Sequence, residues 1–128
     1  MKLRSKLFIV TAALLALFTF SIDCRNALAQ TPSDTVKVTF IEIGAAKCIP
    51  CKAMQPIMKE VAEEYKGQVE VVFHDVWTVK GKIDAMKYRI RVIPTQVFLD
   101  KNGKEYFRHE GYFPKDELIK VIKMQGVK

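Results

Sequence analysis

The sequence predicts an α/β fold in which helices cover both faces of one mixed four-stranded sheet. Segments rich in β-branched and aromatic residues alternate with segments of helical periodicity, in the order strand, helix, strand, helix, strand, strand, helix. A helical crossover joins the first two strands, so these two should run parallel. Asn102-Gly103 between the last two strands indicates an antiparallel hairpin.

The first half of the domain is expected to run from a strand into a long helix. Residues 36–43 alternate in side-chain character and end near Gly44, which is typical of a strand. The apolar residues that follow recur at the spacing of one helix face: Met54, Ile57, Met58, Val61, Ala62 and Tyr65. Pro56 lies within this pattern and should kink the helix, and Gly67 ends it.

The second half supplies the rest of the sheet. We expect strands at 69–76, 95–100 and 105–109, with a helix at 80–89 before the hairpin. The last helix opens at Pro114 and places Asp116 and Glu117 in its first turn, where the helix dipole favours negative charge. A length of 128 residues, 49% of them hydrophobic, suits one small domain with its own core.

The N-terminus is typical of a signal peptide. A positively charged start is followed by 16 uncharged residues, 7–22, fewer than the ~20 that a bilayer-spanning helix needs. Ala27-Leu28-Ala29 then forms a small-x-small cleavage site, which predicts a cleaved segment 1–29, a linker 30–35 and a domain 36–128. Two alternatives are an uncleaved membrane anchor and lipidation of Cys24, although Asp23 fits a lipoprotein cleavage site poorly.

Cleavage would change the charge and the cysteine content of the chain. Four of the 21 basic residues and one of the 14 acidic residues lie in the predicted signal peptide, so the formal net charge falls from +7 to +4. No basic stripe indicates nucleic-acid binding. Only Cys48 and Cys51 remain of the three cysteines, which suits a periplasmic or otherwise extracytoplasmic protein in oxidising surroundings.

Cys48-Ile49-Pro50-Cys51 carries the chemistry that the sequence indicates. Cys48 falls where a strand ends and a helix begins, and free N–H groups and the helix dipole there stabilise a thiolate. A lowered thiol pKa makes such a cysteine the attacking group. Cys51 lies one turn further on, close enough to close a small disulfide ring, and Pro50 suits the first helical turn.

A cysteine pair of this spacing has other interpretations. Half of a zinc site would need two more thiolates or histidines, and His74 and His109 do not form a local pair. A purely structural disulfide is the other alternative, but closing so short a loop gains little entropy. We expect no metal and no cofactor.

Two separate motifs resemble the thioredoxin family. The run Cys48–Pro56 resembles the thioredoxin active-site helix, including proline before the second cysteine and the proline inside the helix. The run Tyr88–Thr95 resembles the segment ahead of the family's cis-proline. The likeness spans about residues 36–121 and implies a minimal thioredoxin-like fold, β-α-β-α-β-β-α.

The resemblance implies roles for matching residues. Cys48 would be the nucleophile, and Cys51 would resolve the mixed disulfide. Pro94 would be cis and would expose the Ile93 backbone to an extended substrate; the alternative is a proline that simply begins a strand. Glu42 would be a buried acid that exchanges a proton with Cys51, unless it is a solvated edge residue.

The active-site run also departs from the family pattern. Ile49 stands in place of the usual glycine, and together with Pro50 it is expected to contact substrate. Lys47 and Gly44 occupy positions where the family usually has tryptophan. We interpret Trp77, in the loop after the second strand, as a packing residue, and the two histidines as ordinary surface or core residues.

These features predict an extracytoplasmic dithiol reductase, since proline before the second cysteine resembles the reducing end of the family. Its partners would be exported protein disulfides as substrate and a membrane thiol-relay protein as electron donor, and it would be a monomer. Potentials in this fold run from about −270 to about −120 mV. The alternatives are an oxidase or isomerase on the same residues, and a copper(I)-binding dithiol module.

Overall fold

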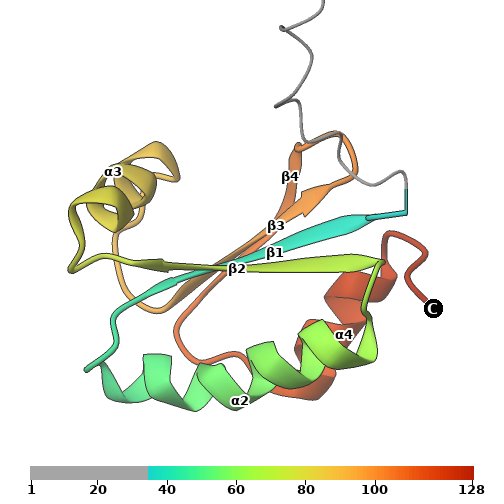
Figure 1. Cartoon of the computed structure of the whole chain (residues 1–128), viewed down its shortest axis with the longest axis horizontal. Coiled ribbons are helices and arrows are strands. Elements are labelled where there is room, and N and C mark those ends of the chain that lie inside the picture. Colours follow the sequence, from blue (N-terminus) through green and yellow to red (C-terminus); the bar gives the residue numbers. More distant parts are fainter. Residues whose placement is uncertain (1–34) are drawn as a thin grey trace, which may run out of the picture. The chain divides into compact units, whose positions relative to one another are not determined.

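The computed structural model describes residues 35–128, so the predicted signal peptide and residues 30–34 of the predicted linker lie outside the described residues. The described elements occur in the predicted order: β1 (Val38–Gly44), α2 (Ile49–Glu64), β2 (Val69–Asp75), α3 (Val79–Lys87), β3 (Thr95–Asp100), β4 (Glu105–Glu110) and α4 (Lys115–Lys123). This is the predicted α/β fold, with helices on both faces of a four-stranded mixed sheet (Figure 1).

The sheet has the strand order β2-β1-β3-β4. Strand β1 pairs in parallel with β2 and antiparallel with β3, and β3 pairs antiparallel with β4. The carboxyl ends of β1 and β2 therefore meet the beginning of β3 at one edge of the sheet. The predicted hairpin turn joins β3 to β4, and Gly103 there has a φ of 75°, which glycine adopts without steric cost.

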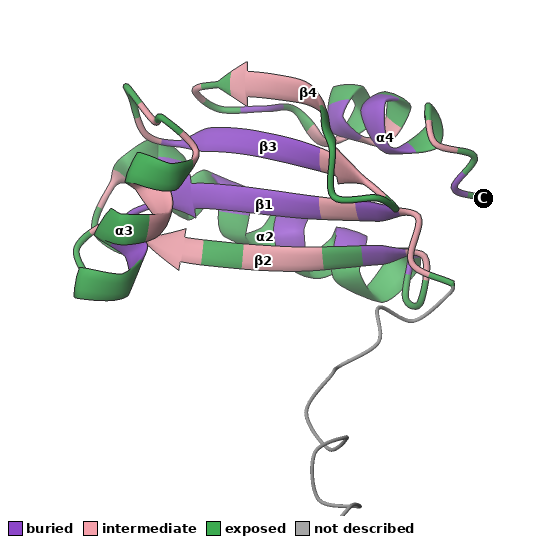
Figure 2. Ribbon diagram, turned by 90° about the horizontal axis from the view of Figure 1, so that it is seen from above, coloured by how far each residue is buried: buried purple, intermediate pink, exposed green. Residues whose placement is uncertain are grey.

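The two faces of the sheet carry two separate apolar clusters. Val38, Phe40 and Phe98 face α2 and α4 and belong to the larger cluster. Ile41, Ile43 and Val97 point to the opposite face, beside α3. Because β1 lies between two neighbours and under helices on both sides, its residues other than Thr39 are buried, on both faces (Figure 2).

Helix α2 fixes the position of the cysteine pair. It begins directly after Cys48, its N-cap residue, and runs through Pro56 to Glu64, with Gly67 at a φ of 81° beyond its end. The predicted apolar face is inward, since Met54 and Val61 are fully buried. No helix among residues 35–128 is long and apolar enough to span a membrane.

Candidate active site

The cysteine pair lies at the edge of the sheet where β1 and β2 end. Cys48 and Cys51 are joined by a disulfide, with their Cα atoms 5.2 Å apart. Cys48 is partly exposed, whereas Cys51 is 1% exposed. The two sulfur atoms therefore differ in access, and only Cys48 is placed to meet a partner from solvent.

Local hydrogen bonds explain why Cys48 stands at the helix start. The Cys51 backbone N–H donates to Cys48 Sγ over 3.4 Å, and Lys52 N donates to the Cys48 carbonyl over 2.9 Å. The first turn of α2 contains no acidic side chain. The N–H donors and the dipole of α2 thus favour negative charge on this sulfur, as the sequence predicts.

Gly44 allows α2 to approach the end of β1. A Cβ atom at Gly44 would lie 3.1 Å from Cys51 Sγ and 3.5 Å from the ring of Phe73. A larger residue here would have to displace the buried sulfur. The aromatic ring of Phe73, from β2, lies beside the position where the family usually has tryptophan.

Glu42 is completely buried on the same face as Gly44. Its exposed fraction is 0%, because β1 is a central strand, so it is not the solvated edge residue that the sequence left as an alternative. Gln96 Nε2 on β3 donates to Glu42 Oε2 over 3.0 Å. Burial raises the pKa of Glu42 to about 8, and the hydrogen bond from Gln96 acts in the opposite direction. Glu42 can thus gain or lose a proton near neutral pH.

Pro94 lies at the start of β3, at the same edge of the sheet as the cysteines. The register places Ile43 opposite Thr95, so the segment before β3 reaches the end of β1. The Ile93–Pro94 peptide bond is cis, Pro94 is buried and Ile93 is partly exposed. The Pro94 carbonyl accepts a hydrogen bond from Gly111 N over 2.8 Å.

A family model described as a thioredoxin-like domain matches residues 24–126. The chain belongs to the thioredoxin family. It is 33% identical over 94 residues to thioredoxin C-2 of Corynebacterium nephridii, which covers 73% of this chain and 79% of that protein. It is 37% identical over 86 residues to chloroplastic thioredoxin Y of Oryza sativa subsp. japonica, covering 67% of this chain but only 49% of the rice protein.

Solved thioredoxin structures resemble the described fold. A mutant thioredoxin from Halobacterium salinarum has a TM-score of 0.64 at 25% identity, covering 75% of this chain and 79% of that one. Chloroplastic thioredoxin z has a TM-score of 0.63 at 28% identity, covering 75% of this chain and 83% of that one. Both similarities agree with the thioredoxin-like fold that the sequence predicts.

Trp77 lies at the surface, next to the residue that precedes Cys48. We interpreted it as a packing residue, but 56% of it is exposed, and Lys47 Nζ lies 5.9 Å from the centre of its ring. The interpretation is wrong because the loop after β2 emerges at the edge where the parallel strand β1 also ends. The predicted parallel pairing of the first two strands already indicates that the segments after them lie close together, because the carboxyl ends of parallel strands meet at one edge of the sheet.

The other residues predicted to contact substrate are exposed, and each histidine has a partner of its own. Ile49 is 82% exposed and Pro50 is exposed beside it. His74 pairs with Asp84 at 2.9 Å, while the His109 ring is stacked on Phe113 with centroids 4.2 Å apart. Within residues 35–128 no three His, Cys, Asp or Glu side chains are grouped to hold a metal ion.

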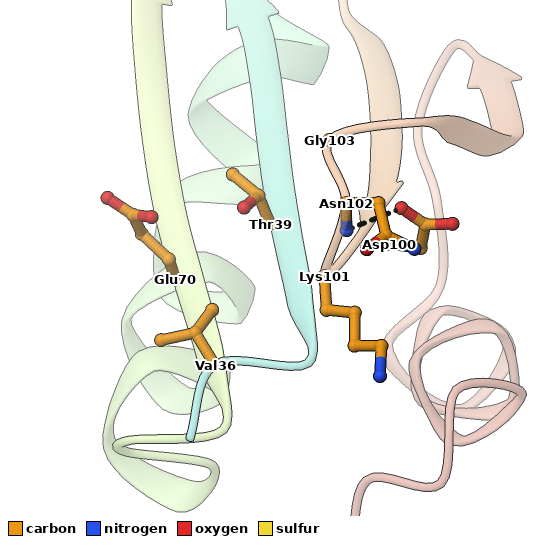
Figure 3. Close-up of a pocket in the computed structure, with 7 residues that line it drawn as sticks. All are labelled: Val36, Thr39, Glu70, Asp100, Lys101, Asn102 and Gly103. Atoms are coloured by element: carbon orange, nitrogen blue, oxygen red, sulfur yellow. Dashed lines mark hydrogen bonds between the residues drawn. The ribbon is translucent and has the colours of Figure 1, made fainter. Parts of the chain in front are cut away.

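A surface pocket lies away from the cysteines. It is formed by Thr39 and Glu70 near the beginnings of β1 and β2 and by the β3–β4 turn, Asp100–Gly103, together with Val36 (Figure 3). The Asp100 carboxylate accepts hydrogen bonds from Asn102 N and Lys104 N, so it stabilises the turn. The pocket is therefore a feature of the hairpin, at the opposite end of β1 from the cysteine pair.

Proposed function

We propose that the protein is a thiol–disulfide oxidoreductase that reduces disulfides of exported proteins through Cys48 and Cys51. The observation that carries this proposal is the asymmetry of the pair. The more accessible Cys48 sulfur is the N-cap of α2 and accepts a hydrogen bond from Cys51 N, whereas Cys51 is 1% exposed. An accessible thiolate and a protected second thiol are what a two-step exchange needs.

The reaction would begin from the dithiol form. The Cys48 thiolate attacks one sulfur of a substrate disulfide, and the other substrate sulfur leaves as a thiolate and takes a proton. Cys51 then loses its proton to Glu42 and attacks Cys48 Sγ, which breaks the mixed disulfide and releases the second substrate sulfur as a thiolate. That thiolate takes up a proton from solvent, and Glu42 returns its own proton to solvent. Two electrons pass to the substrate, and the Cys48–Cys51 disulfide is formed.

Substrate would bind along the exposed rim of the pair. Ile49 and Pro50 are exposed beside Cys48, and the Ile93 backbone precedes the buried Pro94. An extended substrate segment could pair with the Ile93 backbone as an added strand. This arrangement would hold a substrate sulfur at Cys48 and keep it from Cys51.

The N-terminal sequence pattern supports an extracytoplasmic setting. Segment 1–29 would direct export, and the mature domain would work in the periplasm or an equivalent compartment as a monomer. Because the oxidised form must be reduced again, a membrane thiol-relay protein would deliver electrons from the cytoplasm. Neither nucleic acid nor a bound cofactor is part of this function.

Equilibration of the purified protein in glutathione buffers tests the direction of electron flow. We expect a two-electron potential towards the reducing end of the family, about −270 mV. The Cys48→Ser and Cys51→Ser variants should lose the transition, and only Cys51→Ser should accumulate a mixed disulfide with a substrate such as insulin. A potential well above that of glutathione would contradict the reductase and favour an oxidase.

A further inference from the structure

Gln96 is a long polar side chain placed inside the larger apolar cluster. It is 0% exposed and stands on β3 directly opposite Glu42 of β1. Its neighbour two residues on, Phe98, is part of the apolar core on that face. Burying an amide is costly unless it forms hydrogen bonds, and an apolar side chain would fill the same space. The contacts of Gln96 therefore need an explanation.

The Gln96 amide joins the two halves of the active site. Gln96 Nε2 donates to Glu42 Oε2 over 3.0 Å and to the Gly111 carbonyl over 3.1 Å. Gly111 N in turn donates to the Pro94 carbonyl over 2.8 Å. One buried amide thus links the carboxyl group on β1 to the backbone that holds Pro94.

Glu42 lies on the face of β1 that also carries Gly44, next to the cysteine pair in register. Residues 42 and 44 share a face, and Gly44 lies against Cys51 Sγ. Because Glu42 Oε2 is engaged by Gln96, Oε1 is the oxygen left to carry a proton, and it has no hydrogen-bond partner among the described residues. The hydrogen bond from Gln96 therefore determines which oxygen of the Glu42 carboxyl group is left without a hydrogen-bond partner.

We propose that Gln96 is a positioning residue, which holds the Glu42 carboxyl group in place for proton exchange with Cys51 and ties it to the Pro94 segment. The inference rests on the proposed function. As Cys51 attacks Cys48, the ionised fraction of Glu42 accepts the Cys51 proton on Oε1. Because the Gln96 amide nitrogen donates to the Glu42 carboxylate, it favours the ionised form that must receive the proton. Gln96 Oε1 has no hydrogen-bond partner among the described residues.

The elements that pack around Glu42 carry the following titratable residues. Helix α2 contributes Cys51, and β4 contributes His109, which pairs with Gln96 in register. The segment after β4 contributes Tyr112, whose carbonyl is 3.1 Å from His109 Nε2. On the β2 side, the residue opposite Glu42 is Phe73, which does not titrate.

The test uses Gln96→Leu and Gln96→Met, which remove the donor and retain bulk. In the oxidised protein, a carboxyl ¹³C NMR titration should place the Glu42 midpoint about one pH unit higher than in wild type. In the reduced protein, the pH profile for release of a peptide from its Cys48 mixed disulfide should move in the same direction. The shift of the release profile should not appear when Glu42→Gln is already present.

Each outcome bears on a different proposal. An unchanged Glu42 midpoint in a folded Gln96 variant would overturn the positioning role, as would a profile shift that persists in the Glu42→Gln background. If Gln96→Leu does not fold, Gln96→Met gives the same comparison with a more flexible side chain. A shifted midpoint in a protein that forms no mixed disulfide would support the Glu42–Gln96 pair and contradict the proposed reductase.

Discussion

The two faces of the sheet differ in how completely the helices above them bury their apolar side chains. The face under α2 and α4 carries the larger core, in which Phe98 contacts several other aromatic rings. On the opposite face, α3 has only Gly81 among its buried residues, while Ile83 and Met86 are 62% and 78% exposed (Figure 2). The face under α2 and α4 is therefore the more deeply buried of the two.

Residues near the cysteine pair lie in both environments, some deeply buried and some exposed. The deep face removes Glu42 and Cys51 from water, which raises the pKa of Glu42 to about 8. On the α3 side of the sheet, the loop after β2 carries Trp77, which is half exposed and lies next to Lys47. In the proposed mechanism, equal exposure of Cys48 and Cys51 would remove the distinction between the attacking and the resolving thiol.

Phe98→Ala should have the largest effect, because it empties the centre of the deep face. We expect a loss of about 3–5 kcal/mol in the free energy of unfolding, from lost burial and the cavity left behind. Ile83→Ala on the shallow face is the matched control and should change the value by less than about 0.5 kcal/mol. Urea unfolding measures both. Similar losses in the two variants would contradict the difference in packing depth.

Gly81→Ala tests how α3 is attached to the sheet. A Cβ atom here would overlap the Asp75 carbonyl oxygen, which is backbone and cannot rotate away. We expect a loss of about 1–3 kcal/mol in unfolding free energy, as for other overpacked sites. Gly103→Ala is a useful comparison, since its cost would come from a φ of 75° and not from contact. Unchanged stability of Gly81→Ala by thermal unfolding would show that α3 moves freely.

The pH dependence of stability should report the burial of Glu42. Between its ordinary pKa of 4.5 and its folded value of about 8, the folded state keeps a proton that the unfolded state has released. The unfolding free energy should therefore fall by up to about 1.4 kcal/mol for each pH unit across this window, and level off above it. Glu42→Gln should remove this slope. An equal slope in both proteins would mean that Glu42 is not the titrating group.

Most of the fold could be predicted from the sequence, because its signals are local. Alternation, helical spacing and the Asn102-Gly103 turn each act over a few residues, and the observed elements follow them. Cys48 and Cys51 were found for the same reason. The placement of Gln96 opposite Glu42 and of Trp77 beside Lys47 was not, because it depends on cross-strand register and on which loops meet at one edge. A glutamine in a strand gives no sign in sequence of the carboxylate opposite it.

Trp77→Ala should have the smallest effect on stability and a visible effect on exchange. Because 56% of Trp77 is exposed, the unfolding free energy should change by less than about 0.5 kcal/mol. Its ring and the Lys47 ammonium form an aromatic and cationic rim beside Cys48, so forming the mixed disulfide with insulin should slow by a few fold, about what 0.5–1 kcal/mol of contact provides. Trp77→Phe should retain most of the rate. Val79→Ala, also exposed and on α3, should retain it fully, and a matching loss there would assign the effect to α3 as a whole instead of the rim.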